Sequence, residues 1–145
     1  MNREQFLEYM DHFNNHRWDK VTSYFCPDVT LEYPDSFGKP GSPSRTLHGP
    51  QEFIENYQAI ATNIREVLNL GAFMSYGSQF FVELITEFHV FRDAPEGSRA
   101  LGKKGDVIVM NQCVLYDVDE QGKFKRIRIF HHRYLDPSIA QHKDA

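Results

Sequence analysis

Two long strand-like segments near the C-terminus constrain the fold of this chain most. Residues 106–118 (DVIVMNQCVLYDV) and 124–132 (FKRIRIFHH) are rich in β-branched and aromatic residues that alternate with polar ones. That alternation is typical of strands with one buried face. The intervening residues, Asp119 to Gly122, have turn chemistry, and Gly122 can adopt a positive φ. The sequence therefore predicts an antiparallel hairpin of two long strands.

The second of these strands carries a histidine on the same face as two aliphatic residues. Alternation places Ile127, Ile129 and His131 on one face. A sheet face that is apolar along its length and polar at one end is typical of a ligand-pocket wall. A histidine that caps an ordinary core gives the same pattern, so the strand alone leaves both interpretations of His131 open.

The rest of the chain predicts helices followed by strands. Phe6, Tyr9, Met10 and Phe13 lie at helical spacing within Arg3–Asn14. Further helices are expected at Trp18–Phe25 and Pro50–Asn63, strands at Asp28–Tyr33 and Ser78–Arg92, and loops at 35–45 and 94–105. Residues 66–76 are ambiguous, with a strand or a connector expected near Leu68–Ser75. This order predicts an α+β fold, with three helices packed on one face of a curved antiparallel sheet.

Size and charge restrict the class of protein further. The 145 residues are predicted to form a single domain, 1–145. The aromatic share of 14% exceeds what a small core needs, which fits an apolar ligand site as well as a Phe-rich core. The net charge is −4 and no basic stripe is present, so no nucleic-acid partner is expected.

The cysteines and the N-terminus predict a cytoplasmic protein. Cys26 and Cys113 match neither a zinc spacing nor a disulfide framework, which favours a reducing compartment. The first ten residues lack the apolar segment of a signal peptide. No run of 18 apolar residues is present, so no membrane partner is expected.

Three sequence segments resemble those of a known family. They are FLEYMDHFNNHRWDKVTSYFCPDVTLEYP, LHGPQEFIENY and QGKFKRIRIFHHRYLDP. In order and spacing they resemble the nuclear transport factor 2-like superfamily, especially its SnoaL-like polyketide cyclases and its ketosteroid isomerases. The resemblance covers most of the chain. It implies a cone-shaped curved sheet (an α+β barrel) that encloses a pocket, and a homodimer.

The catalytic residues of the ketosteroid isomerases are only partly matched. Laid on this chain without a gap, the first-helix tyrosine of that branch falls on Tyr9 and its last-strand pocket position on His131. The position of its catalytic acid is Tyr33, and its second acid falls near Asn111 or Gln112. The resemblance therefore implies the scaffold but not that acid/base pair.

Several side chains are candidates for the chemistry. His131 is the first choice for a catalytic base, because imidazole can exchange a proton near neutral pH, and Asp35 and Glu87 are the alternatives. Asp35 follows the strand-ending Pro34 and could reach a pocket mouth, although turn formation explains it as well. His89 shares a strand face with Glu87, which could orient it, but a solvent-facing polar edge is the simpler interpretation.

Hydrogen-bond donors and contact residues complete the candidate site. Tyr9, Tyr33 and Asn111 are predicted donors to a substrate oxygen, although plain packing also explains Tyr9. The other predicted substrate contacts are Phe13, His48, Tyr57, Ile127 and Ile129. For His48, helix capping competes with a place at the pocket mouth.

These features together predict an enzyme that needs neither a metal nor an organic cofactor. We expect an isomerase, cyclase or dehydratase (a lyase) that acts on a small carbonyl-bearing polyketide-like or polycyclic metabolite, in secondary-metabolite biosynthesis. The alternatives are a non-catalytic binding module of the same fold, an epoxide hydrolase and a protein-interaction domain. An epoxide hydrolase would need an Asp–Arg–Asp arrangement, and none is clear in the sequence.

Overall fold

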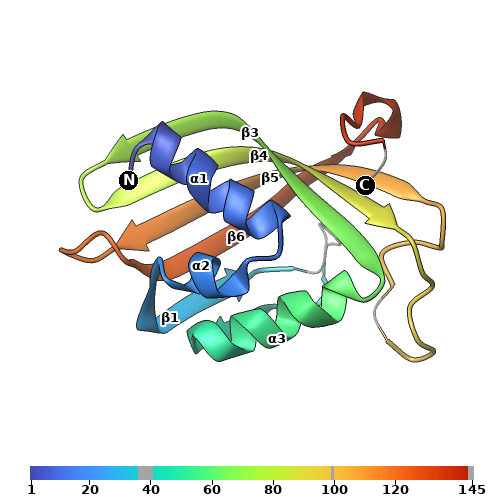
Figure 1. Ribbon diagram of the computed structural model, residues 1–145, viewed down its shortest axis with the longest axis horizontal. Helices are drawn as coiled ribbons and strands as arrows, with labels where there is room; N and C mark the ends of the chain where they lie inside the picture. The colour runs from blue at the N-terminus through green and yellow to red at the C-terminus, as the bar shows by residue number, and fades with distance from the viewer. Residues whose placement is uncertain (36–40, 99, 144–145) are drawn as a thin grey trace.

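The protein folds into one curved six-stranded sheet with three helices on its inner side (Figure 1). The computed structural model describes residues 1–35, 41–98 and 100–143. The elements in chain order are α1 (Arg3–Asn14), α2 (Trp18–Thr22), β1 (Phe25–Tyr33), β2 (Arg45–His48), α3 (Gly49–Ala61), β3 (Ile64–Tyr76), β4 (Gln79–Val90), β5 (Val107–Val118), β6 (Phe124–Leu135) and the 3₁₀ turn η1 (Pro137–Ile139). The predicted α+β fold is confirmed.

The sheet has the order β2-β1-β6-β5-β4-β3. Neighbouring strands run antiparallel except for β1 and β6, which are parallel. The expectation of a wholly antiparallel sheet is therefore wrong at this one junction. The two strands start side by side, with Phe25 opposite Phe124 and the amide of Phe124 bonded to the carbonyl of Tyr24. Pairing from Phe25 onward also explains why α2 ends at Thr22 rather than at Phe25.

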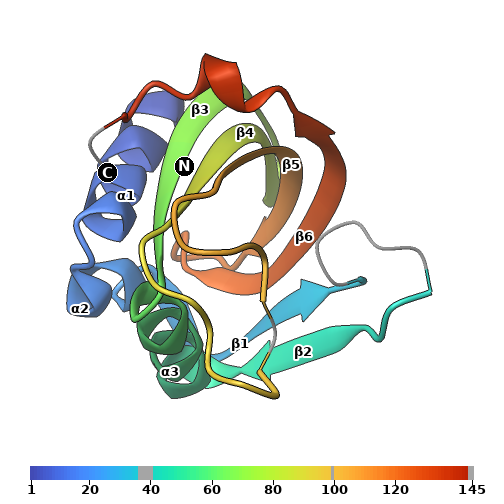
Figure 2. The same ribbon diagram turned by 90° about the vertical axis from the view of Figure 1, so that its right-hand side faces the viewer.

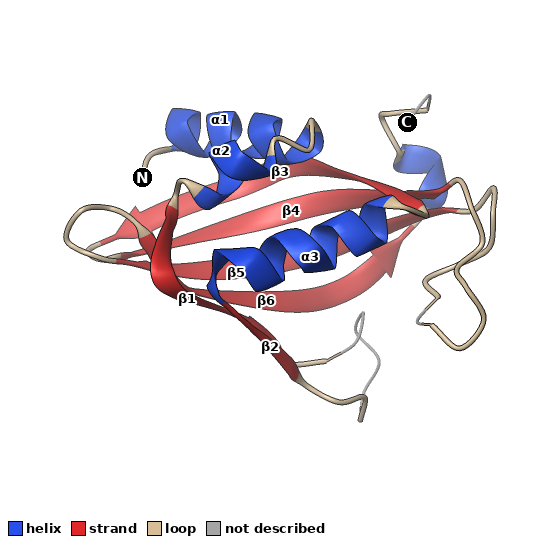
Figure 3. Ribbon diagram, turned by 60° about the horizontal axis from the view of Figure 1, so that its bottom comes forward, coloured by secondary structure: helices blue, strands red, loops and turns tan. Residues whose placement is uncertain are grey.

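Figure 2 shows the sheet end-on, curled so that its concave side faces the helices. Irregular register interrupts β3–β4 pairing between Leu70 and Phe73, and β5–β6 pairing between Asn111 and Gln112. Such bulges bend strands and increase their twist. Figure 3 shows that α3 crosses the open side of the curl. The curvature thus creates a cone that the helices cover.

One end of the cone is filled by aromatic side chains. Phe6 of α1 is fully buried and packs at ring-centroid distances below 6 Å against Phe80 and Tyr116. Phe80 and Tyr116 stack on each other at 4.3 Å, and Tyr116 lies 5.0 Å from Phe124. The capping box between Asn2 and Gln5, with both backbone amides bonded, starts the helix that places Phe6 there.

The short strand β2 was not predicted. Residues 35–45 were expected to form a loop, and residues 36–40 of that stretch lie outside the described residues. Arg45 instead begins β2, opposite Tyr33 of β1. No helix in the described part of the chain is long and apolar enough to cross a membrane.

Candidate functional site

A pocket of about 590 Å³ lies between the sheet and the helices, and Tyr116 of the aromatic cluster forms part of its wall. The first helix contributes Tyr9 and Phe13 to its wall, as expected from the inward face of that helix. Most of the wall is apolar, and includes Leu31, Phe53, Ile60, Leu68, Leu84, Phe88, Val90, Val114, Ile127 and Ile129. A concave, largely apolar space with a few polar groups is typical of small-molecule sites.

His131 and Asp35 form an interacting pair in this wall. Their Nδ1 and Oδ1 atoms lie 3.1 Å apart, and the His131 side chain is only 4% exposed while that of Asp35 is 29% exposed. The sheet aligns them because β6, which carries His131, pairs with β1, which ends next to Asp35. An ionised Asp35 can only accept a hydrogen bond, so Nδ1 of His131 is the donor in such a pair.

Two tyrosine hydroxyls form a second polar group in the pocket. Tyr33 of β1 and Tyr57 of α3 have their hydroxyl oxygens 2.6 Å apart. Burial raises the pKa of Tyr33 to about 12 and the pKa of Tyr57 well above its ordinary value. Both hydroxyls therefore stay protonated near neutral pH, and one proton of the pair remains available to donate to a bound oxygen.

Glu66 is a pocket residue that the sequence did not indicate. Its carboxyl group lines the same space, and desolvation by burial raises its pKa to about 8. Among the described residues, Glu66 forms no ion pair with an arginine. At neutral pH it keeps its proton and can donate a hydrogen bond, as a carboxylic acid in an apolar site does.

The amide expected in the pocket is not the one that lines it. Asn111 points to the outer face of the sheet, where its Nδ2 donates to Glu83 at 3.2 Å. Its neighbour Gln112 lines the pocket instead and accepts from the Thr86 hydroxyl at 2.8 Å. His48 is exposed at the start of α3, makes no side-chain capping bond and does not line the pocket.

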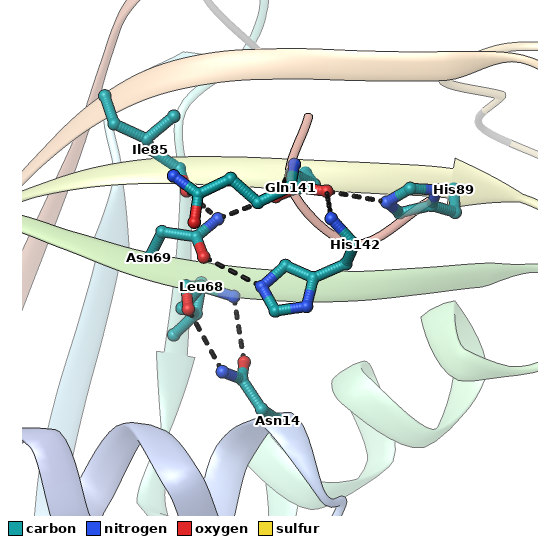
Figure 4. A network of polar contacts seen from close by, with 8 residues as sticks. Asn14, Leu68, Asn69, Ile85, His89, Gln141 and His142 are labelled. Atoms are coloured by element: carbon teal, nitrogen blue, oxygen red, sulfur yellow. Dashed lines mark hydrogen bonds and ion pairs between the residues drawn. The ribbon is translucent and has the colours of Figure 1, made fainter. Parts of the chain in front are cut away.

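His89 and Glu87 do not line the pocket. Figure 4 shows His89 close to Asn69, Gln141 and His142 in a polar network. Glu87 is 1% exposed and accepts hydrogen bonds from Asn69 Nδ2 at 2.9 Å and from the backbone amides of Gln141 and His142 at 3.0 and 3.1 Å. His89 Nε2 lies 2.9 Å from the same carboxyl group. The carboxylate therefore holds the C-terminal segment against the sheet, and the structure does not bring this pair together with His131.

Hydrogen bonding also sets the charge state of Glu87. Burial by itself raises the pKa of this carboxyl group, but the bonds from Gln141, His89, His142 and Asn69 outweigh it, so the pKa is lowered overall. Glu87 is thus an ionised structural anchor. Within the described residues, no cluster of three His, Cys, Asp or Glu side chains could hold a metal ion.

Comparisons with known proteins agree on the fold of this chain. The SnoaL-like domain family matches residues 6–127. A nuclear transport factor 2-like protein of unknown function from Burkholderia pseudomallei is similar in structure, with a TM-score of 0.69 and 17% identity over 93% of this chain and 90% of that one. A sequence comparison with curated proteins finds no match.

Two further solved structures carry functional descriptions. A candidate polyketide cyclase from Xanthomonas campestris has a TM-score of 0.67 and 20% identity, over 86% of this chain and 84% of that one. An epoxide hydrolase/cyclase-like enzyme, with a role in pyran ring formation in the polyether salinomycin, has a TM-score of 0.64 and 19% identity over 91% of this chain and 95% of that one. At such identities the likeness shows the fold alone.

Proposed function

Because the chain belongs to the SnoaL-like domain family, we propose that it is an acid/base enzyme that isomerises, cyclises or dehydrates a small carbonyl-bearing metabolite of polyketide or polycyclic type. The observation that carries the proposal is the His131–Asp35 pair, held at 3.1 Å in the wall of an apolar pocket. The Tyr33–Tyr57 pair lines the same pocket, and a base and hydroxyl donors in one pocket support proton transfer at a carbon next to a carbonyl group.

The reaction begins with removal of an α-proton from the bound substrate. Asp35 accepts a hydrogen bond from Nδ1 of His131 and so orients the imidazole ring that takes the substrate proton. His131 becomes an imidazolium ion, and the electron pair of the broken C–H bond moves into the carbonyl group to give an enolate. The neighbouring Asp35 carboxylate stabilises the positive ring.

The enolate oxygen needs hydrogen-bond donors. The Tyr33–Tyr57 pair and the protonated Glu66 supply them from β1, α3 and β3. Donors that are fixed in a site from which water is excluded stabilise developing negative charge more than water does. The imidazolium then returns its proton to another carbon (isomerisation), to an oxygen formed by ring closure (cyclisation) or to a leaving hydroxyl group (dehydration).

The contacts of the arginines favour this chemistry over epoxide hydrolysis. Arg128 bonds to Asp117 at 3.2 Å, and neither residue lines the pocket. Arg45 and Arg92 do line the pocket, but neither forms an ion pair with a carboxylate among the described residues. A carboxylate–arginine–carboxylate array held by ion pairs is therefore absent from the described pocket wall.

Exchange of α-protons for deuterium tests the proposal without knowledge of the true substrate. The probe is 2-tetralone, an apolar bicyclic ketone, followed by proton NMR in D₂O. We expect the protein to accelerate exchange over buffer at the same pH, and Asp35→Asn to reduce the acceleration at least about tenfold. His132→Ala is the matched control, since His132 is exposed beside His131, and should exchange at the wild-type rate. Exchange no faster than in buffer would favour a non-catalytic binding module.

A further inference from the structure

Arg45 is a pocket cation without a carboxylate partner among the described residues. Its place is fixed by β2, where it lies opposite Tyr33. The guanidinium group stacks over the Tyr33 ring at 4.6 Å, and Nη1 donates to Oδ1 of Asn56 on α3 at 2.7 Å. The side chain is therefore held at the pocket wall by neutral groups alone.

Two donors of this arrangement have nothing to bond to. Arg45 Nε and Asn56 Nδ2 are both buried and without a hydrogen-bond partner among the described residues. The orientation of the amide is not arbitrary, because the guanidinium group has only donors and must face the Asn56 oxygen. Buried donors without partners are costly, so the Arg45–Asn56 pair lacks an acceptor.

The ionised groups of the pocket give an independent indication of the same kind. Among the described lining residues the carboxyl groups are Asp35 and Glu66, and the arginines are Arg45 and Arg92. Asp35 is paired with His131, and Glu66 keeps its proton near neutral pH because burial raises its pKa to about 8. Positive charge therefore exceeds negative charge in the pocket, which raises the local concentration of anions.

We propose that Arg45 and Asn56 form a subsite for a substrate carboxylate, so that the substrate is an aromatic or polycyclic carboxylic acid. A carboxylate accepts two hydrogen bonds at once from such donors after a rotation of the side chains toward it, as in bidentate arginine–carboxylate pairs. The inference rests on the proposed function and deepens it, because it names the chemical class of the substrate from which His131 takes a proton.

Two probes of the same shape isolate the contribution of the charge. These are 2-naphthoate and 2-acetylnaphthalene, in which a methyl group replaces one carboxylate oxygen and the carbonyl group is kept. Isothermal titration at pH 7 should show the wild-type protein binding 2-naphthoate about 10- to 100-fold more tightly than the ketone, the factor expected of a charge-assisted hydrogen bond. Equal affinities, or no binding of 2-naphthoate at millimolar concentration, would overturn the proposal.

Three variants locate the effect. Arg45→Met and Asn56→Asp should both abolish the preference for 2-naphthoate. The second variant keeps the shape of the side chain but pairs Arg45 with an internal carboxylate, so it also answers the case in which Arg45→Met fails to fold. Arg92→Met removes the other pocket arginine and should keep the preference. A preference that survives in Arg45→Met or in Asn56→Asp, or that is lost only in Arg92→Met, would contradict the assignment.

The binding test and the exchange test examine different proposals, so one proposal can fail while the other stands. Binding is measured at equilibrium and does not depend on turnover. If exchange of 2-tetralone protons is no faster than in buffer but the preference for 2-naphthoate depends on Arg45, the subsite stands and the acid/base proposal falls. If exchange is catalysed but the two probes bind equally, the acid/base proposal stands and the carboxylate subsite falls.

Discussion

Two histidine–carboxylate pairs lie on the same sheet and differ in the side that they face. His131 and Asp35 are 3.1 Å apart in the pocket wall, whereas His89 and Glu87 are 2.9 Å apart on the outer face of β4. The first carboxyl group has 29% of its side chain exposed. The second is 1% exposed and is covered by the C-terminal segment.

The comparison shows that the pairing of residue types does not define a catalytic dyad. A base must reach the proton that it takes, and of these two pairs only the His131 pair borders the pocket. The Glu87 carboxylate instead satisfies two backbone amides of the C-terminal segment. The same pair of residue types thus borders a pocket on one side of the sheet and anchors the chain on the other.

Removal of the outer carboxylate should have the largest effect on stability. Glu87→Ala leaves the amides of Gln141 and His142, the Asn69 side chain and His89 without their shared acceptor. We expect a loss of about 3–5 kcal/mol in the free energy of unfolding, the usual cost of breaking a buried pair on one side. Urea denaturation measures it.

The matched control for that variant is Asp35→Ala on the pocket side. Because Asp35 is partly exposed, its removal should cost about 1 kcal/mol while it reduces exchange of 2-tetralone protons. Glu87→Ala should keep the exchange rate per folded molecule. Equal losses of stability in the two variants would refute the distinction between an anchor and a site.

The pH dependence of stability should differ between Glu66 in the pocket and Glu87 on the outer face of the sheet. In the folded protein the pKa of Glu66 is about 8, against an ordinary value of 4.5 in the unfolded chain. The folded state therefore holds a proton that the unfolded state releases between these values, so stability falls as pH rises from about 4.5 to about 8. Glu66→Gln should remove this part of the loss.

Unfolding by urea at pH 5 and pH 8 checks that expectation. The wild type should lose more free energy of unfolding than Glu66→Gln, by at least about 1.4 kcal/mol, which corresponds to one pKa unit. Glu87→Gln is the control on the outer side. The pKa of Glu87 is lowered, so its contribution is present above its unfolded pKa and is lost only in acid. Identical pH profiles for wild type and Glu66→Gln would contradict a neutral Glu66.

A substitution on the exposed part of the outer face should have the smallest effect on the free energy of unfolding. Phe130 is 43% exposed there, opposite Cys113 of β5, and apolar surface of this kind favours contact with a second copy of the chain. We expect a homodimer by light scattering, which Phe130→Glu converts to a monomer with a change in monomer stability within about 0.5 kcal/mol. Tyr76→Glu, at the exposed tip of the β3–β4 hairpin, should leave the dimer intact. A wild-type monomer at micromolar concentration would refute the expectation.

The sequence predicted those features that depend on local periodicity. Alternation along β6 placed Ile127, Ile129 and His131 on one face, and all three line the pocket. Helical spacing gave α1 its observed limits, Arg3–Asn14. A resemblance in order and spacing then supplied the cone shape with an enclosed pocket, which alternation alone does not encode.

The features that were missed depend on partners distant in the chain. Arg45 lies in a segment rich in Gly, Pro and Ser, and becomes part of a strand only because β1 pairs with it. Glu66 was left out because β3 begins at Ile64, four residues before the predicted start. The anchor on Glu87 uses backbone amides of residues 141 and 142, which carry no signal in the sequence.

The measurement that tests the account most directly compares the two histidines. His131→Ala and His89→Ala remove the same group from the two pairs, and each variant is assayed for exchange of 2-tetralone protons and for its free energy of unfolding. We predict that His131→Ala reduces exchange about 10²- to 10⁴-fold with a stability loss of about 1 kcal/mol. His89→Ala should keep the exchange rate per folded molecule. Full exchange activity in His131→Ala, or its loss in His89→Ala, would contradict the assignment of the pocket pair as the catalytic one.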